Sequence, residues 1–319
     1  MSATQPRAYA AAHFALELDG KERNDIGLFR SIEGGGVRAD AISYAVGGSY
    51  DRMKQLGKPK FEDIKLQVGM AMSQPFYKWI EEFFTGIATR KDGVIVAADF
   101  YYVERARRKF TAALIKEIAF PKLDAADKNA AYMNVGLSVE NMEFEAPKEP
   151  RKLQPPQGFD QQKLWTACNF SMTIDGYEEA CRRISKVDGF TIKQNIIEHN
   201  VGGQRAALKI PSAIEFPNLS FTLPAVDADL LYARYLAFGA NGQVPSAIPD
   251  GAKGTTATRL HGEITMQDNG RNDLFQLEFS GGDIINITPD RLDAGSEEIA
   301  QVKIEMYIEK MKFKYMRVA

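Results

Sequence analysis

The stretch Phe14-Ala-Leu-Glu-Leu-Asp-Gly20 places large apolar side chains at every second position and ends in an Asp-Gly turn signal. This pattern is typical of a β-strand with one buried face. The stretch Phe170-Ser-Met-Thr-Ile-Asp-Gly176 repeats the pattern about halfway along the chain. A repeat at such a distance predicts that the chain holds two copies of one β domain.

Further matches extend outward from these two stretches in the same order. Ile32-Glu33-Gly34 matches Val187-Asp188-Gly189, and Val46-Gly47-Gly48 matches Val201-Gly202-Gly203 with the same shift along the chain. We call this shift, which takes Ile32 to Val187, the first offset. It also relates four apolar positions to four others, namely Phe61, Ile64, Leu66 and Val68 to Phe216, Leu219, Phe221 and Leu223. Six such matches in one order predict a tandem duplication.

The shift grows towards the end of each copy. Leu123-Asp124-Ala125 matches Leu292-Asp293-Ala294, and we call the shift that takes Leu123 to Leu292 the second offset. The second offset is larger than the first, which predicts an insertion in the second copy. Residues 241–258, rich in Gly, Pro, Ser, Ala and Thr, are its expected place.

The domain boundaries follow from the repeat and from a proline-rich segment. With 319 residues the chain is long for one domain and comfortable for two. We expect a first domain over residues 1–144, a linker over 145–163 and a second domain over 164–319. Prolines keep such a linker extended and stiff, although proline-rich segments also serve as docking ligands.

Each copy is expected to be a set of strands with one helix. Pro75 suits a first helical turn, and Gly86 suits a helix end. Helical stripes are formed by Phe76, Trp79, Ile80 and Phe83 in the first copy and by Leu231, Tyr235 and Phe238, followed by Gly239, in the second. Alternation ends in a parity switch near Met142 and Met311, which predicts a β-bulge or a strand that crosses between sheets. The expected fold class is all-β, with two tandem β-sandwiches or barrels and one flanking helix each.

The composition favours a protein without dedicated chemistry. The net charge is −2, and no histidine, cysteine or glycine pattern corresponds to a catalytic, cofactor or metal-binding motif. We therefore expect that the protein is not an enzyme and that it has no catalytic residue, no cofactor and no metal. The N-terminal stretch lacks the apolar core of a signal peptide, and no run is long enough for a membrane span. Synthesis in the cytoplasm is expected.

Two basic clusters leave a nucleic-acid interpretation open. Arg105, Arg107, Arg108 and Lys109 form one cluster, and Lys310, Lys312, Lys314 and Arg317 form the other. The second alternates with Met311, Phe313 and Tyr315, and cations interleaved with aromatic side chains can bind single strands. Any half-buried strand alternates in this way, so a solvated face or a subunit interface is the favoured interpretation.

In these motifs the chain resembles the phage tail-tube protein family, which includes inner-tube proteins of contractile injection systems. The resemblance rests on residues 14–20, on Gly47-Gly48 followed by a polar loop and Lys58-Pro59, and on the strand Ile64–Gly69 with Trp79 after it. The family has Lys-x-Pro-Gly and a strand ending in Arg-Gly, where this chain has Pro59-Lys60 and Val68-Gly69. The second copy keeps Gly202-Gly203 and Pro211.

The resemblance implies a structural subunit whose domains join sheets around a ring of six. With two domains per chain, three chains form a pseudo-hexameric ring that stacks into a conduit for DNA or an effector. The loops of residues 44–60 and 198–210, which hold Gly47, Gly48, Lys58, Pro59, Gly202, Gly203 and, at the edge, Pro211, are the expected ring-stacking loops. The implied partners are further copies of the chain and sheath and baseplate proteins, and no membrane contact is implied. The implied location is a virion tail or an injection particle. An adaptor ring between a trimeric spike and a sixfold tube, or a soluble β-barrel ligand-binding module, remain alternatives.

Overall fold

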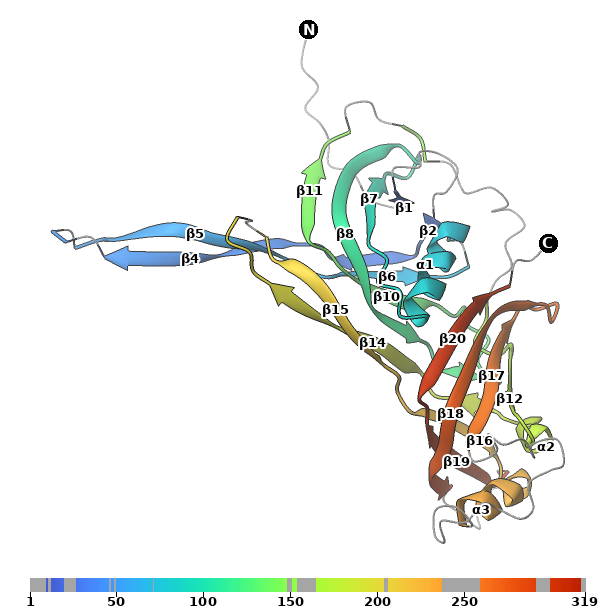
Figure 1. Ribbon diagram of the computed structural model, residues 1–319. Helices are drawn as coiled ribbons and strands as arrows, with labels where there is room; N and C mark the ends of the chain where they lie inside the picture. Colours follow the sequence, from blue (N-terminus) through green and yellow to red (C-terminus); the bar gives the residue numbers. More distant parts are fainter. Residues whose placement is uncertain are drawn as a thin grey trace.

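The chain folds mostly into β-strands, as expected from its alternation (Figure 1). The computed structural model describes residues 10, 13–19, 27–45, 47–48, 50–70, 72–147, 151–153, 165–203, 206–236, 259–290 and 299–316. We call residues up to 147 the first half and residues from 165 onward the second half. The predicted insertion at 241–258, like Phe238 and Gly239, lies outside the described residues.

Most strands of the first half form one sheet, two form a separate hairpin, and β9 joins the sheet of the second half. The sheet has the order β2-β1-β7-β8-β10-β6-β3, and β11 also pairs with β8. The hairpin consists of β4 and β5 alone. The bounds are β1 His13–Leu18, β2 Gly27–Leu28, β3 Ser31–Gly34, β4 Val37–Ala45, β5 Arg52–Phe61, β6 Ile64–Val68, β7 Lys91–Ala98, β8 Glu104–Phe120, β9 Leu123–Asp124, β10 Met133–Ser138 and β11 Asn141–Glu145.

The helix of the first half lies where the sequence predicts it. Helix α1 spans Gln74–Phe84 with proline in its first turn, and it buries Phe76, Trp79, Ile80 and Phe83. Gly86, just beyond its end, has a positive φ of 77°, a conformation that glycine adopts at little cost. The aromatic stripe is therefore core, packed among the buried strand residues.

The second half follows a similar order, with α2 and η2 in addition and no described counterpart of β2 or β9. Its bounds are β12 Phe170–Ile174, α2 Glu178–Cys181, β13 Lys186–Val187, β14 Phe190–His199, β15 Leu208–Glu215, β16 Leu219–Pro224, the 3₁₀ turn η2 Ala225–Asp227, α3 Asp229–Tyr235, β17 Leu260–Gln267, β18 Asp273–Pro289, β19 Gln301–Tyr307 and β20 Lys310–Tyr315. Helix α3 is the expected helix and buries Leu231. The one-turn helix α2 is too short to show a helical stripe, and the sequence did not predict it.

Strand pairing in the two halves follows the two offsets of the sequence repeat. Val94 pairs with Lys109 in the first half, and the second offset takes this pair to Glu263 and Glu278, which also pair. Ile32 pairs with Leu66, and the first offset takes this pair to Val187 and Phe221, which pair as well. We call two residues equivalent when the first offset relates a residue within 31–81 to one within 186–236, or when the second offset relates a residue from 90 onward to its counterpart.

Irregularities of the strands also fall at equivalent positions. The hairpin β4–β5 shifts register between Ala39 and Ala41, and β14–β15 shifts between Gln194 and Ile196. Ala112 in β8 and Gly281 in β18 both have positive φ, 51° and 75°. At these two kinks β8 and β18 pass from β10 and β19 to β11 and β20, which explains the parity switch seen in the sequence.

The two halves are joined by strand pairing as well as by packing. Strand β14 of the second half pairs with β8 of the first, and β9 pairs with β13. One continuous group of buried apolar residues includes members of both halves. Part of the predicted linker is also attached, because the Arg151 carbonyl accepts a backbone hydrogen bond from Glu104 and the Leu153 N–H donates one to Tyr102. Residues 148–150 and 154–164 lie outside the described residues.

Candidate assembly surfaces

The hairpin β4–β5 projects away from the rest of the molecule (Figure 1). Every residue of β4 is exposed, and most residues of β5 are exposed as well. Large apolar side chains are among them, with Ile42 at 57% and Leu56 at 69% exposure. A long two-stranded ribbon with unpaired edges and exposed apolar groups is unusual for a free surface, because it invites pairing with another chain.

The structure corrects the predicted loops of residues 44–60 and 198–210. Gly47 and Gly48 lie in the turn at the tip of β4–β5, but Lys58 and Pro59 lie within β5, and Pro211 lies within β15. Gly202 and Gly203 lie in the turn after β14. Glycine and proline within a strand usually argue for a loop. Pro59 is tolerated here because, among the described strands, β5 pairs only with β4, so its other edge needs no backbone donor.

The second hairpin, β14–β15, docks on the first half instead of projecting freely. Phe190 pairs with Phe120 and Ile192 pairs with Ile118, so β14 continues the sheet of the first half at the end of β8. The Phe120 and Phe190 rings stack with centroids 5.2 Å apart. Ile118 and Ile192 are both fully buried. This junction therefore has the character of a domain core.

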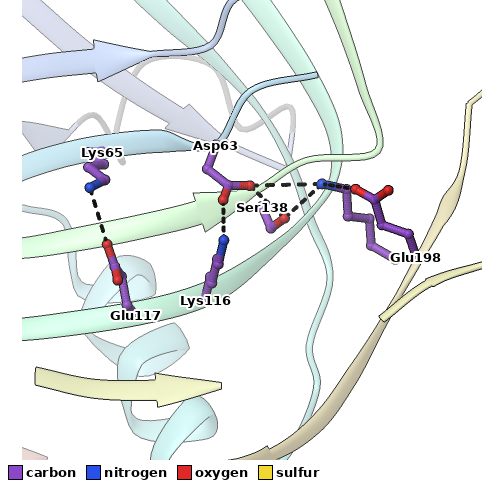
Figure 2. A network of polar contacts seen from close by, with 7 residues as sticks. Asp63, Lys65, Lys116, Glu117, Ser138 and Glu198 are labelled. Carbon is purple, nitrogen blue, oxygen red and sulfur yellow. Dashed lines mark hydrogen bonds and ion pairs between the residues drawn. The ribbon is translucent and has the colours of Figure 1, made fainter. Parts of the chain in front are cut away.

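Lys209 of β15 is the polar centre of the docked hairpin. Its side chain is only 10% exposed, and its ammonium group donates to the hydroxyl of Ser138 at 3.0 Å. The ammonium nitrogen also lies 3.9 Å from a carboxylate oxygen of Asp63 and 3.6 Å from one of Glu198. Figure 2 shows Asp63 between Lys116 and Ser138, with Glu198 on the opposite side of the network.

The backbone of Lys209 is held as firmly as its side chain. Its N–H donates to Glu140 Oε1 at 2.8 Å, and its carbonyl accepts from the Arg90 guanidinium at 2.7 Å. Arg90 Nε and Glu140 Oε1 are 3.8 Å apart. The Arg90–Glu140 pair thus acts as a clamp that fixes one peptide position of β15 on the first half.

The charges of this network alter two pKa values. Burial acts to raise the pKa of Asp63, but hydrogen bonds from Lys116 and Ser138 and the charges of Lys116 and Lys209 outweigh it, so the pKa is lowered. The hydrogen bond to Asp63 raises the pKa of Lys116. Lys116 Nζ and Asp63 Oδ2 are 2.6 Å apart. The network is therefore charged at neutral pH and stabilises the junction in that form.

A second contact between the halves is made by helix α1 and strand β20. The Tyr77 and Tyr315 rings stack with centroids 4.1 Å apart, and Phe84 stacks on Phe313 at 5.9 Å. The Tyr315 N–H donates to Glu81 Oε1 at 3.0 Å. The two halves thus cover each other: helix α1 of the first half covers β20, and hairpin β14–β15 of the second half covers β8.

Several cations of the basic clusters lie opposite carboxylates, but Lys310 and Lys314 lie opposite Ser280 and Gln276, and Arg317 lies outside the described residues. Arg107 pairs with Glu17 and Glu104, and Lys109 lies opposite Glu143 in the register of β8 and β11. Lys312 lies opposite Glu278 in the register of β18 and β20. In the first cluster this arrangement favours a solvated face over a nucleic-acid surface, which would leave its cations available for phosphates.

The docking network leaves no recognisable pattern in the sequence. Lys209, Asp63, Ser138 and Glu140 come from separate segments of the chain, and the sequence gives no signal that brings them together. Lys209 itself stands between the apolar residues Leu208 and Ile210, but this pattern does not indicate its partners.

Residues 10–143 match the family model described as T4-like virus tail tube protein gp19. The resemblance to tail tube proteins expected from the sequence is confirmed for this segment. No curated protein matches the chain. The family is a structural one, in agreement with the expectation that the chain is not an enzyme. Within the described residues, no helix is long and apolar enough to cross a membrane.

Solved structures of injection-system particles show limited similarity to the chain. A chain from an extracellular contractile injection system, the PVC sheath–tube complex in its extended state, is 18% identical, with 45% of this chain and 95% of that chain covered and a TM-score of 0.38. A chain from the baseplate of the anti-feeding prophage is 14% identical, with 46% and 99% covered and a TM-score of 0.38. A chain from the cap of the same prophage is 18% identical, with 45% and 95% covered and a TM-score of 0.38.

Proposed function

We propose, on the premise that residues 10–143 are a tail tube domain, that the chain is a structural subunit with two such domains and that three chains form a pseudo-hexameric ring. The observation that carries this proposal is the equivalence of strand pairing, with the same registers and irregularities in both halves. A tandem duplication accounts for that equivalence. If each domain occupies one of six positions around a ring, a two-domain chain requires three copies.

The rings are proposed to stack through the distal parts of the two hairpins. Gly47 and Gly48 at one tip and Gly202 and Gly203 at the other lie in turns that no described element covers. Tyr44 and Met53 lie opposite each other near the first tip and are 49% and 55% exposed. Stacking would bury these side chains, whereas Lys58, Pro59 and Pro211 lie in the strands that support the tips.

The stack would form a conduit for DNA or an effector, with sheath and baseplate proteins around it, in a virion tail or an injection particle. The family match supports the tube role, and the cargo is inferred from that role alone. Arg107 and Lys312 lie against carboxylates, which is consistent with passage of a cargo without sequence-specific binding.

Mass photometry and negative-stain microscopy of the purified chain test the proposal. We expect a species of three chains, rings with six lobes in projection, and rods at high concentration. A monomer that persists up to the highest attainable concentration would contradict the ring. A dimer as the terminal species would contradict it equally.

An adaptor ring is a second candidate, favoured by the differences between the halves. The buried Arg234–Asp283 pair of the second half has Trp79 and Leu114 as its equivalents in the first. Alternate positions around the ring would therefore differ, which suits a link between a threefold and a sixfold part. Rings that form but never elongate would favour this function over a continuous tube.

A further inference from the structure

We propose that the projecting hairpin β4–β5 docks on strand β18 of a neighbouring copy in the register with which β14–β15 docks on β8 within the chain. The inference rests on the proposed ring and specifies its interface. The two hairpins are equivalent, and so are the two receiving strands, but only one of the two contacts is made inside the chain. In Figure 1 the hairpin β4–β5 points away from β18 of its own chain.

The register follows from the contact that the chain already makes. Ile192 pairs with Ile118 in the internal junction. Their equivalents are Val37 on β4 and Ile287 on β18, so these two residues are expected to pair between chains, with Arg38 opposite Asn286.

The receiving edge is open in the described residues. From Asp283 to Pro289, β18 pairs with β19 on one side, while β17 and β20 pair with it only up to Gly282 and Ser280. The corresponding edge of β8 is the one that β14 occupies. An uncovered strand edge has unpaired backbone groups and readily accepts a strand from another chain.

Exposure differs between equivalent residues as this interface requires. Ile192 is 0% exposed, whereas its equivalent Val37 is 46% exposed. Phe313, which α1 covers, is 5% exposed, whereas its equivalent Phe144 on β11 is 60% exposed. Helix α3 is equivalent to α1, so α3 of one chain would cover Phe144 of the next chain while β4–β5 of that next chain covers β18.

The clamp that holds Lys209 is also present in the second half. Arg259 and Glu309, the equivalents of Arg90 and Glu140, form an ion pair. Glu140 is 17% exposed under the docked hairpin, whereas Glu309 is 51% exposed. The residue equivalent to Lys209 is Lys54 of β5, which is exposed. The pair is therefore placed to accept the Lys54 N–H on Glu309 and to donate from Arg259 to the Lys54 carbonyl.

The side-chain partners of the clamped lysine differ between the two sites. Asp63 and Ser138, which surround the Lys209 ammonium, have Asn218 and Tyr307 as their equivalents. Pro289 of β18 is the equivalent of Phe120 of β8, and as a proline it has no backbone N–H to donate. The interface between chains thus lacks a carboxylate and one donor that the internal junction has, which makes it the weaker of the two and suits reversible assembly.

Disulfide trapping tests the register. In a Cys168→Ser background, the double variant Val37→Cys, Ile287→Cys is oxidised with copper phenanthroline and analysed by non-reducing electrophoresis. Cys181 is buried, and burial raises its pKa to about 12, so it stays unreactive. We expect covalent species of two and three chains and none larger, because a closed ring has no free end.

Two matched controls make this result specific. An equimolar mixture of the single variants Val37→Cys and Ile287→Cys is expected to give covalent dimers only, because each chain then carries one half of the pair. The double variant Arg38→Cys, Ile287→Cys places the thiols on opposite faces and should not cross-link. Cross-linking of this slipped pair as strong as that of the first pair would overturn the proposed register.

A second experiment separates the interface from the ring itself. Arg259→Ala should shift the midpoint of trimer assembly at least tenfold to higher concentration without changing the circular dichroism spectrum. Glu179→Ala, which removes an exposed partner of Arg182, is the matched control and should leave assembly unchanged. The inference would be overturned if Arg259→Ala assembled into trimers normally and the Val37→Cys, Ile287→Cys variant formed trimers without cross-linking. The proposed ring would still stand in that case. A wild-type chain that forms no trimer would overturn the proposed function.

Discussion

Asp63 is the residue on which the internal junction depends most. Its carboxylate accepts hydrogen bonds from Lys116 on β8 and Ser138 on β10 and lies near the Lys209 ammonium on β15. It thus connects the sheet of the first half to the hairpin of the second. Removing one member of such a network leaves the remaining charges without their partner, which costs more than the bond itself is worth.

We expect Asp63→Asn to lower the free energy of unfolding by about 1–3 kcal/mol at pH 7. The pKa of Asp63 is lowered in the folded state, so its contribution is present above the ordinary value of 3.8 and is lost as the pH falls through the folded-state pKa. The variant should therefore approach the stability of the wild type in acid. Urea unfolding from pH 7 to pH 3 measures this.

Asp40→Asn is the control for that experiment. Asp40 pairs with Lys60 on the exposed hairpin, where both side chains are more than half exposed. Exposed pairs contribute little, so we expect no measurable change at either pH. An equal loss of stability in both variants would show that Asp63 acts only as a surface charge.

A second prediction concerns Arg234 and Asp283, which are almost fully buried. Their side chains form two hydrogen bonds of 2.9 Å between α3 and β18. Asp283→Leu alone should destabilise the chain by about 3–5 kcal/mol, because it leaves a buried guanidinium without its carboxylate. The double variant Arg234→Met, Asp283→Leu should recover most of this loss. Thermal unfolding measures both, and a double variant no more stable than the single one would contradict the argument.

At the scale of elements, the sequence predicted most of what packs into the core and little of what docks. Strand β6 and helix α1 bury one side, so their apolar spacing shows in the sequence. Strands β4 and β5 have no buried face, and the bulge at Ala39–Ala41 switches the parity of β4. A loop was therefore predicted where a long hairpin exists. The docking contacts depend on residues brought together only by the fold.

A third prediction tests the stacking role of the hairpin tip. Tyr44→Lys with Met53→Lys replaces two exposed apolar side chains that face each other across β4 and β5. We expect six-lobed rings to persist and rods to disappear, because stacked rings would bring these positive charges together at a surface that stacking should bury. Negative-stain microscopy counts both species. Ala45→Lys, on the other face of the ribbon and opposite Arg52, is the control, and loss of rods in this control as well would deny a specific face to stacking.

At the scale of the whole molecule, the described residues of each chain present one projecting hairpin and one open edge of β18. These two surfaces differ, so the proposed contacts between chains run head to tail. A dimer satisfies one hairpin and leaves one hairpin and one edge empty. A ring of three satisfies every surface, and its last contact forms within one assembly, where the effective concentration of the two ends is high.

The last prediction follows from this difference in satisfied surfaces. Sedimentation velocity over a wide range of concentrations should show a steep transition from monomer to trimer, with the dimer always a minor species. The dimer lacks the contact that closes the ring, so only the trimer gains its free energy. The transition should therefore be sharper than a stepwise association of equal contacts. Arg259→Ala weakens each contact and should therefore shift the whole transition to higher concentration without accumulating dimers. A dimer that dominates at intermediate concentration would mean that two copies already satisfy each other, and a head-to-tail ring of three could not then be the assembled state.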